Sequence, residues 1–331
     1  MILSVSDLRI WFGEPGAELV AVDGLGFEVE EGEIFAVIGE SGSGKTLTGM
    51  SVVGLAPATA RASGSIRFRG REMLNRPEAE LRRIRGREIG IVYQDPLGSM
   101  NPVWPVGEQI AEALRAHGLA DHRKAARRAV ELLERVHIPD AARVAKAYPH
   151  EVSGGMRQRA MIAMALACGP KLLIADEPTT ALDVTIKAQI LDLLAELRRD
   201  MALTVIIITH DMGVVAELAD RILVMYAGRA AEIGAADTIM RRPAHPYTRA
   251  LMLSAMMSQG EPKRELPAIQ GTAPMLNAFP EGCRFHPRCP LATADCRRSV
   301  PALRPHGPVQ LACHHPLVTG ATAPAPVGAR S

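Results

Sequence analysis

Short apolar runs alternate with segments of helical periodicity through most of the chain. Several of these runs are continuous, as in strands buried on both faces of a parallel sheet: residues 33–38, 172–175 and 204–208. Helical patterns occur at residues 45–54, over most of 96–150, and at 186–198. Strands that alternate with helices predict an α/β fold in which helices pack around a sheet.

Two other regions predict short antiparallel strands. Near the N-terminus the strand patterns are residues 8–12, 19–22 and 25–29, with a turn at Asp23 and Gly24, and residues 65–69 and 89–92 are further strand patterns. Residues 221–226 and 229–233 predict a hairpin that turns at Ala227 and Gly228. The fold class expected is therefore a mixed sheet with an antiparallel part.

The composition changes near residue 258. Prolines from Pro262 to Pro290 rule out long helices there, and residues 319–331 are small and Pro-rich, as in disordered tails. We predict a large domain at 1–257, with a helical subdomain at about 96–165. A small domain rich in Pro and Cys is expected at 258–318, followed by the disordered tail.

The net charge of +2 among 331 residues is too small for a nucleic-acid binder, and no nucleic-acid partner is expected. The basic residues at 123–128 form a solvated helix face in this interpretation. No apolar stretch reaches the roughly 20 residues that span a bilayer, and the N-terminus lacks the features of a signal peptide. We expect a cytoplasmic protein whose membrane role comes through a partner.

Residues 39–46 match the phosphate-binding pattern G-x-x-x-x-G-K-S/T and lie between a predicted strand and a predicted helix. Glycines let phosphate approach the backbone, and a helix N-terminus favours anions. Lys45 is expected to bind the β- and γ-phosphates of ATP, and Thr46 to ligate Mg²⁺. The nucleotide-binding residues predicted here are Gly39, Ser41, Gly42, Ser43, Gly44, Lys45, Thr46 and Thr48.

Polar residues end the other apolar runs. We expect Asp176 to hold Mg²⁺ and Glu177 to activate the attacking water as a general base. Gln94 is expected to contact Mg²⁺ or water, and His210 to hold the γ-phosphate and orient Glu177. The carboxyl ends of parallel strands are where open sheets bind ligands.

Ser153, Gly154 and Gly155 form a turn that leads into a helix. This turn offers a second helix N-terminus to phosphate. Because the loop at 39–46 has its own helix, we predict that the second one serves the nucleotide of another subunit. The pattern indicates an ATPase that clamps two domains together.

This ordered set resembles the ATP-binding subunits of ABC transporters. The matching motifs are Walker A at 39–46, the Q-loop at Gln94, the signature at 153–158, Walker B at 172–177, the D-loop at 181–183 and the H-loop at His210. The resemblance adds Asp183 to the nucleotide site and assigns Phe12 to stacking on adenine. Trp11 is the alternative, because only one of two neighbouring strand residues faces the base. Met156 departs from the Gln that is usual in the signature.

A narrower resemblance, to the oligopeptide/dipeptide importers, rests on residues 39–45, 153–159, 245–251, 282–285 and 288–292. It implies a second, similar ATPase subunit, two transmembrane permeases and an extracytoplasmic solute-binding protein, with this chain at the cytoplasmic face of the membrane. ATP would close the ATPase dimer, hydrolysis would open it, and residues 96–150 would meet the permease. The solute stays open: dipeptides, longer peptides, glutathione or nickel chelates.

Four of the five cysteines, Cys283, Cys289, Cys296 and Cys313, fall within the last 49 residues. Thiolate tetrads bind Zn²⁺ or an iron–sulfur cluster, although the spacing here is typical of neither. Because some importers of the narrower family carry a 4Fe–4S cluster at such cysteines, the resemblance implies one here. Zn²⁺ and metal-free thiols are the alternatives, and His286, His314 and His315 leave mixed ligation open. The fifth cysteine, Cys168, is predicted to be a core residue.

Other protein classes use the same ATPase head. Repair ATPases insert a long coiled coil before the signature, and no sustained heptads occur here. Soluble translation factors carry two ATPase domains on one chain, whereas this sequence has one set of ATPase motifs. An ATPase of iron–sulfur assembly fits the cysteines but not the segments at 245–251 and 283–292.

Overall fold

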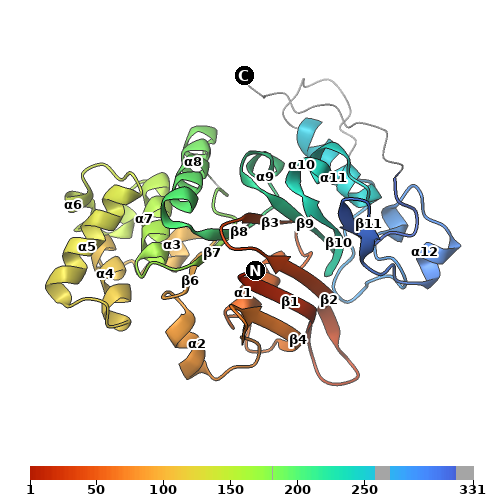
Figure 1. The fold of residues 1–331 in the computed structure, drawn as a ribbon, viewed down its shortest axis with the longest axis horizontal. Coiled ribbons are helices and arrows are strands. Elements are labelled where there is room, and N and C mark those ends of the chain that lie inside the picture. The colour runs from red at the N-terminus through yellow and green to blue at the C-terminus, as the bar shows by residue number, and fades with distance from the viewer. Residues whose placement is uncertain (181, 258–268, 318–331) are drawn as a thin grey trace. The chain divides into compact units, whose positions relative to one another are not determined.

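The computed structural model describes residues 1–180, 182–257 and 269–317 (Figure 1). The chain falls into two compact units, and each is described by itself. The first unit comprises Met1–Val29, Glu33–Asn75 and Ile208–Ser331. The second comprises Glu30–Gly32 and Arg76–Ile207.

The first unit contains an antiparallel sheet with the strand order β2-β1-β4-β5. Its strands are β1 (Leu3–Phe12), β2 (Leu19–Val29), β4 (Arg61–Phe68) and β5 (Arg71–Glu72). The predicted turn at Asp23 and Gly24 is wrong, because β2 runs through both residues. The strand absorbs Gly24 as an irregularity: the pairing with β1 shifts register between Leu8 and Ile10, and Gly24 has a φ of 66°.

Further strands of the first unit neighbour one another in the order β11-β12-β10-β9-β3. They are β3 (Ile34–Ile38), β9 (Arg221–Tyr226), β10 (Arg229–Ala235), β11 (Arg304–His306) and β12 (Val309–Leu311). β3 and β9 are parallel, and β9 and β10 form the predicted hairpin. Helices of this unit are α1 (Lys45–Val52), α9 (Met212–Leu218), α10 (Ala236–Arg241) and α11 (Pro246–Met257).

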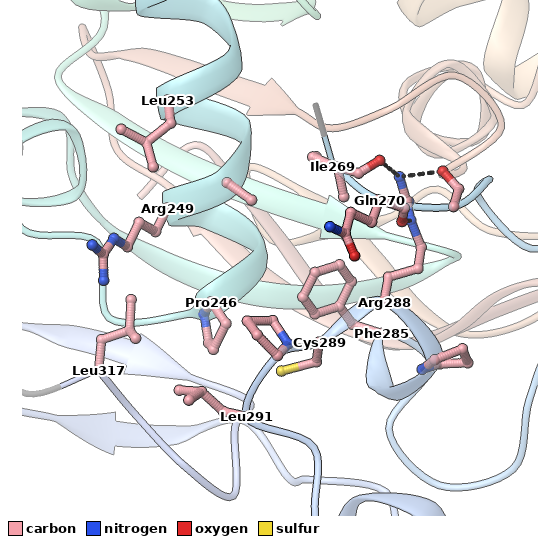
Figure 2. Close-up of a pocket in the computed structure, with 14 residues that line it drawn as sticks. Pro246, Arg249, Leu253, Ile269, Gln270, Phe285, Arg288, Cys289, Leu291 and Leu317 are labelled. Atoms are coloured by element: carbon pink, nitrogen blue, oxygen red, sulfur yellow. Dashed lines mark hydrogen bonds between the residues drawn. The ribbon is translucent and has the colours of Figure 1, made fainter. Parts of the chain in front are cut away.

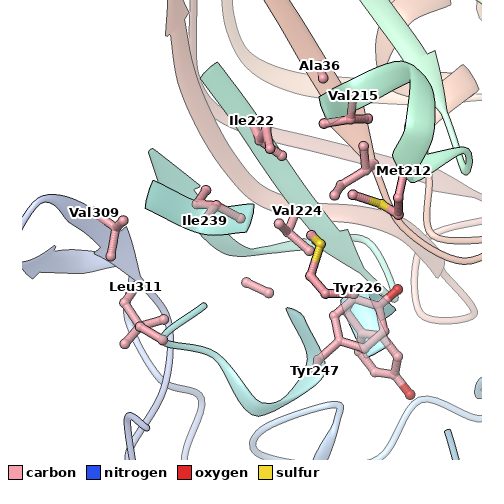
Figure 3. Packing of buried hydrophobic residues seen from close by; sticks show 14 of the residues in the cluster. Ala36, Met212, Val215, Ile222, Val224, Tyr226, Ile239, Tyr247, Val309 and Leu311 are labelled. Carbon is pink, nitrogen blue, oxygen red and sulfur yellow. The ribbon is translucent and has the colours of Figure 1, made fainter. Parts of the chain in front are cut away.

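The C-terminal segment is built into this unit. β12 pairs with β10, and Val309 and Leu311 share one apolar core with Val224, Tyr226 and Tyr247 (Figure 3). The structure therefore does not show a separate small domain. As the prolines predicted, the helices described within 269–317 are short: η2 (His286–Arg288) and α12 (Ala294–Arg298). Residues 258–268 and the predicted tail at 319–331 lie outside the described residues.

The second unit combines strands in the order β8-β7-β6 with a group of helices. The strands are β6 (Ile89–Val92), β7 (Leu172–Asp176) and β8 (Thr204–Thr209), whose end continues into the first unit. Its helices are α2 (Glu78–Ile84), α3 (Pro96–Ser99), α4 (Val106–Ala116), α5 (His122–Arg135), α6 (Ala141–Val144), η1 (Pro149–Glu151), α7 (Gly154–Leu166) and α8 (Val184–Met201). The helical pattern predicted over 96–150 is confirmed.

Local sequence explains where three of the long helices of the second unit, α5, α7 and α8, begin. Asp121, Ser153 and Asp183 each cap a helix, with the side chain accepting a hydrogen bond from a backbone N–H of the first turn. In the ranges 1–180, 182–257 and 269–317, no helix has the length and apolarity needed to cross a bilayer.

Candidate nucleotide site

The loop at residues 39–46 joins β3 to α1, as the motif requires. Gly39 has a φ of 150°, and a Cβ there would lie 2.1 Å from the backbone oxygen of Met225. Gly42 and Gly44 have φ values of 77° and 95°, which disfavour a side chain. The path of this loop therefore depends on its glycines.

The loop gathers donors around its interior. The buried Lys45 ammonium donates to the backbone oxygens of Gly39 at 2.8 Å and Glu40 at 2.9 Å. The Ser43 hydroxyl is buried and has no hydrogen-bond partner among the described residues. Thr48 is also buried and donates to the Gly44 carbonyl at 2.9 Å. A buried cation, an unpartnered hydroxyl and a helix N-terminus together fit a phosphate chain.

The second unit brings two predicted catalytic residues together. Asp176 is buried at the end of β7, and Glu177 follows it with a φ of 47°. The Glu177 carboxylate accepts hydrogen bonds from the Gln94 amide at 3.1 Å and from the Thr180 hydroxyl at 2.8 Å. Thr180 escaped the sequence reasoning. Its position three residues after Glu177 was the available signal.

The turn at 153–155 is supported by its own surroundings. Ser153 is exposed and caps α7 by accepting from the Met156 N–H at 3.3 Å. A Cβ on Gly154 would meet nothing within 4 Å, whereas one on Gly155 would lie 2.8 Å from Ile186 Cγ2 on α8. Asp183 caps that same α8 through the Ile186 N–H. The exposed edge of the turn is thus open to a ligand.

The remaining predicted residues belong to the first unit. His210 follows β8 and is exposed. Phe12 and Trp11 are both half-buried at the end of β1, and the Arg9 guanidinium lies over the Trp11 ring at 5.4 Å. Since His210 and Glu177 belong to different units, their predicted contact stays a prediction.

The four C-terminal cysteines are free thiols. Burial raises the pKa of Cys283 and Cys289, and that of Cys313 to about 11, and neighbouring thiols raise each further. Within the described residues, no group of three or more His, Cys, Asp or Glu side chains is placed to hold a metal ion. Cys168 is partly buried on the second unit, where burial also raises the pKa of its thiol.

Sequence comparison supports the reading of these motifs. The family described as ABC transporter matches residues 22–180, and the oligopeptide/dipeptide transporter C-terminal region matches 231–296. The oligopeptide transport ATP-binding protein OppD of Salmonella typhimurium is 47% identical over 318 residues, which cover 96% of this chain and 94% of the relative. This chain belongs to the ABC transporter family. The dipeptide transport ATP-binding protein DppD of Haemophilus influenzae is 45% identical and covers 96% of both chains.

Solved structures agree with this assignment. The dimeric bacterial ABC transporter cassette MJ0796 is 26% identical with a TM-score of 0.64, covering 71% of this chain and 99% of its own. The cbiO1 protein of Clostridium perfringens is 29% identical with a TM-score of 0.60, covering 72% and 90%. The prediction of an ABC-type P-loop ATPase is confirmed. As a member of this family, the chain hydrolyses ATP and couples hydrolysis to transport.

Proposed function

We propose that this chain is the ATP-hydrolysing subunit of an importer of dipeptides or oligopeptides. The observation that carries the proposal is the match at residues 231–296 to the C-terminal region of oligopeptide/dipeptide transporters. Relatives whose names specify oligopeptide or dipeptide transport align over nearly the whole chain. Nickel chelates and glutathione are the competing solutes, and the relatives favour peptides over them.

In this proposal the loop at residues 39–46 binds the triphosphate, and Gln94 and Glu177 are the hydrolytic groups. Lys45, the Ser43 hydroxyl and the loop N–H groups bind phosphate oxygens, and Phe12 stacks on adenine, since Arg9 already covers Trp11. Mg²⁺ would be held by Thr46, Asp176 and Gln94, and would neutralise charge on the transferred phosphoryl group. His210 would hold the γ-phosphate.

Glu177 acts as the general base on water. Support comes from its two hydrogen bonds, because Gln94 and Thr180 fix the carboxylate at the end of β7. A carboxylate held in one orientation can take the proton of water as the water oxygen attacks the γ-phosphorus, while the bond from that phosphorus to the bridging oxygen breaks and ADP leaves with the electron pair. Gln94 thus joins the catalytic group to the loop that leads into α3 and α4.

Assembly follows from the open turn at Ser153 and Gly154. We propose that it binds the γ-phosphate held by a second, similar ATPase subunit, together with Asp183 of the D-loop, so that ATP closes the pair. The complex would include two transmembrane permeases and an extracytoplasmic solute-binding protein. This chain would lie at the cytoplasmic face of the membrane, in contact with the permeases.

A metal at Cys283, Cys289, Cys296 and Cys313 is a separate part of the proposal. Burial, and after it the neighbouring thiols, raise the pKa of Cys283 and Cys313. Thiolates placed close together repel one another, and a bound cation relieves that repulsion. The side chains as described form no ligand set, so the proposal rests on donor chemistry alone. Anaerobic purification followed by iron and zinc analysis tests it. Iron together with absorption at about 400 nm supports a 4Fe–4S cluster, and zinc alone supports Zn²⁺. A protein that contains neither iron nor zinc contradicts both proposals.

Glu177→Gln tests the ATPase mechanism in the complete transporter. Loss of the general base lowers ATP turnover about 10²–10⁴-fold while ATP binding persists. Lys45→Ala is the contrasting variant and loses binding as well. Steady hydrolysis by Glu177→Gln contradicts the assignment.

Uptake of labelled dipeptide, tetrapeptide, glutathione and nickel chelate by cells with and without the gene identifies the solute.

A further inference from the structure

Glu40, at a variable position of the phosphate-binding motif, is paired with an arginine 248 residues away. Two N–H groups of Arg288 donate to the two carboxylate oxygens of Glu40, at 2.6 and 3.0 Å. The Arg288 side chain is only 6% exposed, and that of Glu40 is 27% exposed. Such a two-pronged pair fixes orientation as well as charge.

The rest of the Arg288 guanidinium is also engaged. It donates to the Tyr226 hydroxyl at 3.2 Å. It also donates to backbone oxygens of residues 269–271, of which the Gln270 contact is 3.0 Å (Figure 2). Arg288 also lines a cavity of about 750 Å³ between α11 and the C-terminal segment. All three nitrogens of the guanidinium, the planar fork of Arg288, therefore donate hydrogen bonds within the protein, so Arg288 is a fixed charge beside Glu40.

Glu40 is held from its backbone side as well. Its N–H donates to the Tyr247 hydroxyl at 2.9 Å, and Tyr247 packs against Tyr226 and Phe285 with ring centres 4.6 and 5.3 Å away. The Glu40 carbonyl in turn accepts from the Lys45 ammonium at 2.9 Å. A continuous set of contacts thus leads from Arg288 through Glu40 to the phosphate-binding lysine.

The segment that carries Arg288 is anchored a second time. Arg284 donates to the Asp23 carboxylate at 2.9 Å, and its guanidinium stacks on Phe279 at 4.2 Å. Asp23 lies on β2, away from the phosphate-binding motif in sequence. This second anchor provides a control, because it attaches the same segment without contacting Glu40.

Electrostatics gives the Arg288–Glu40 pair a function. A carboxylate inside a phosphate-binding loop repels the anionic triphosphate, whereas a carboxylate neutralised by a fixed arginine does not. We propose that Arg288 is a positioning residue for ATP: it neutralises Glu40 and holds the loop, so that ATP affinity depends on the C-terminal segment. The inference rests on the proposed role of residues 39–46 in binding phosphate.

The test measures KM for ATP and kcat in the assembled transporter. Arg288→Met should raise KM about 5- to 100-fold, the range typical of coupled sites, with a smaller change in kcat. Glu40→Gln should lower KM, since Arg288 then faces phosphate beside a neutral amide. The double variant should return KM close to that of the unaltered protein, because removing the carboxylate removes the repulsion.

Controls separate this role from a general loss of structure. Arg284→Met removes the other anchor, and Glu40→Gln should not rescue any defect it causes. If Arg288→Met does not fold, Arg288→Lys keeps a charge but loses the fork, and its KM should rise and depend on salt.

An unchanged KM in folded Arg288→Met, or in Arg288→Lys, overturns the inference. A double variant as impaired as Arg288→Met also overturns it. Normal ATP binding by Lys45→Ala would instead contradict the proposed function, so the two failures are distinguishable.

Discussion

The loop at residues 39–46 and the turn at residues 153–155 both lead into a helix N-terminus, but they are supported differently. The loop depends on groups far away in sequence: the Met225 carbonyl against Gly39, and Tyr247 and Arg288 against Glu40. The turn depends on its own helix, where Ser153 provides the cap, and on the nearby α8. The loop at 39–46 is held by residues distant in sequence, whereas the turn at 153–155 has an exposed edge.

This difference corresponds to the proposed division of work. A loop that binds the nucleotide of its own subunit gains from a preformed shape, since it does not lose entropy by ordering when ATP arrives. A turn that meets the nucleotide of another subunit must instead remain accessible. Substitutions at glycines of the loop and of the turn, and at residues packed against the loop, distinguish a preformed loop from an accessible turn.

The largest effect is expected from Gly39→Ala. The added Cβ would lie 2.1 Å from a backbone oxygen that cannot move without shifting β9. We expect ATP binding to weaken about 100-fold or more, the equivalent of roughly 3 kcal/mol. Titration with a fluorescent ATP analogue measures this.

Gly42→Ala is the matched control for that loop. Gly42 also has a positive φ, of 77°, but a Cβ there would meet nothing within 4 Å. The cost should be limited to the conformational strain of about 1 kcal/mol. Equal damage from the two variants would argue that backbone conformation alone, and not the support by β9, shapes the loop.

The next effect concerns the packing behind the loop and its dependence on pH. His245 is 3% exposed, its Nδ1 accepts from the Tyr247 N–H at 3.0 Å, and burial lowers its pKa to about 4. In the unfolded chain the His245 pKa is about 6.5, so His245 becomes protonated there at a pH where it stays neutral in the folded unit. Stability should therefore fall as pH drops from about 6.5 to about 4, by up to about 3 kcal/mol.

Urea unfolding of the first unit at several pH values checks this loss. Trp11 reports on the first unit once Trp104, the other tryptophan, is replaced by Phe. His245→Asn removes the titration and should flatten the pH profile in this window. A profile as steep as that of the unaltered protein would assign the pH dependence to other groups.

Sequence reasoning succeeded where a motif carries its own local structure. The loop, the Ser153 cap, the acidic end of β7 and the hairpin of β9 and β10 are all specified by neighbouring residues. It failed at Asp23 and Gly24, because a glycine in a strand signals a turn or an irregularity equally well. The pairing with β1, which decides between them, is not a local property.

Long-range support was beyond sequence reasoning for the same reason. Residues 245–251 and 282–292 served only as markers of a family, with no indication that they meet. In the structure Tyr247, Phe285 and Arg288 lie together behind Glu40, within the unit that contains the loop. Contacts across 248 residues depend on the tertiary fold, which no single spacing encodes.

The smallest effect, and the sharpest contrast, is expected from Gly155→Ala beside Gly154→Ala. On Gly155 the new Cβ would lie 2.8 Å from Cγ2 of Ile186, a β-branched residue with restricted rotamers. We expect a loss of about 1–2 kcal/mol in the second unit, measured by urea unfolding with Trp104 as the probe and Trp11 replaced by Phe. Ile186→Ala should restore room for the Cβ and reduce that loss when combined with Gly155→Ala.

Gly154→Ala should behave in the opposite way. Its Cβ has open space, and alanine in place of glycine at the start of α7 should leave the stability of the second unit unchanged or raise it by up to about 1 kcal/mol. ATP turnover by the assembled transporter should nevertheless fall, because the Cβ occupies the edge proposed to meet phosphate. Full turnover in Gly154→Ala would contradict an open phosphate-binding edge. A stability loss equal to that of Gly155→Ala would mean that Gly154, like Gly39 in the loop at 39–46, is packed closely against neighbouring residues.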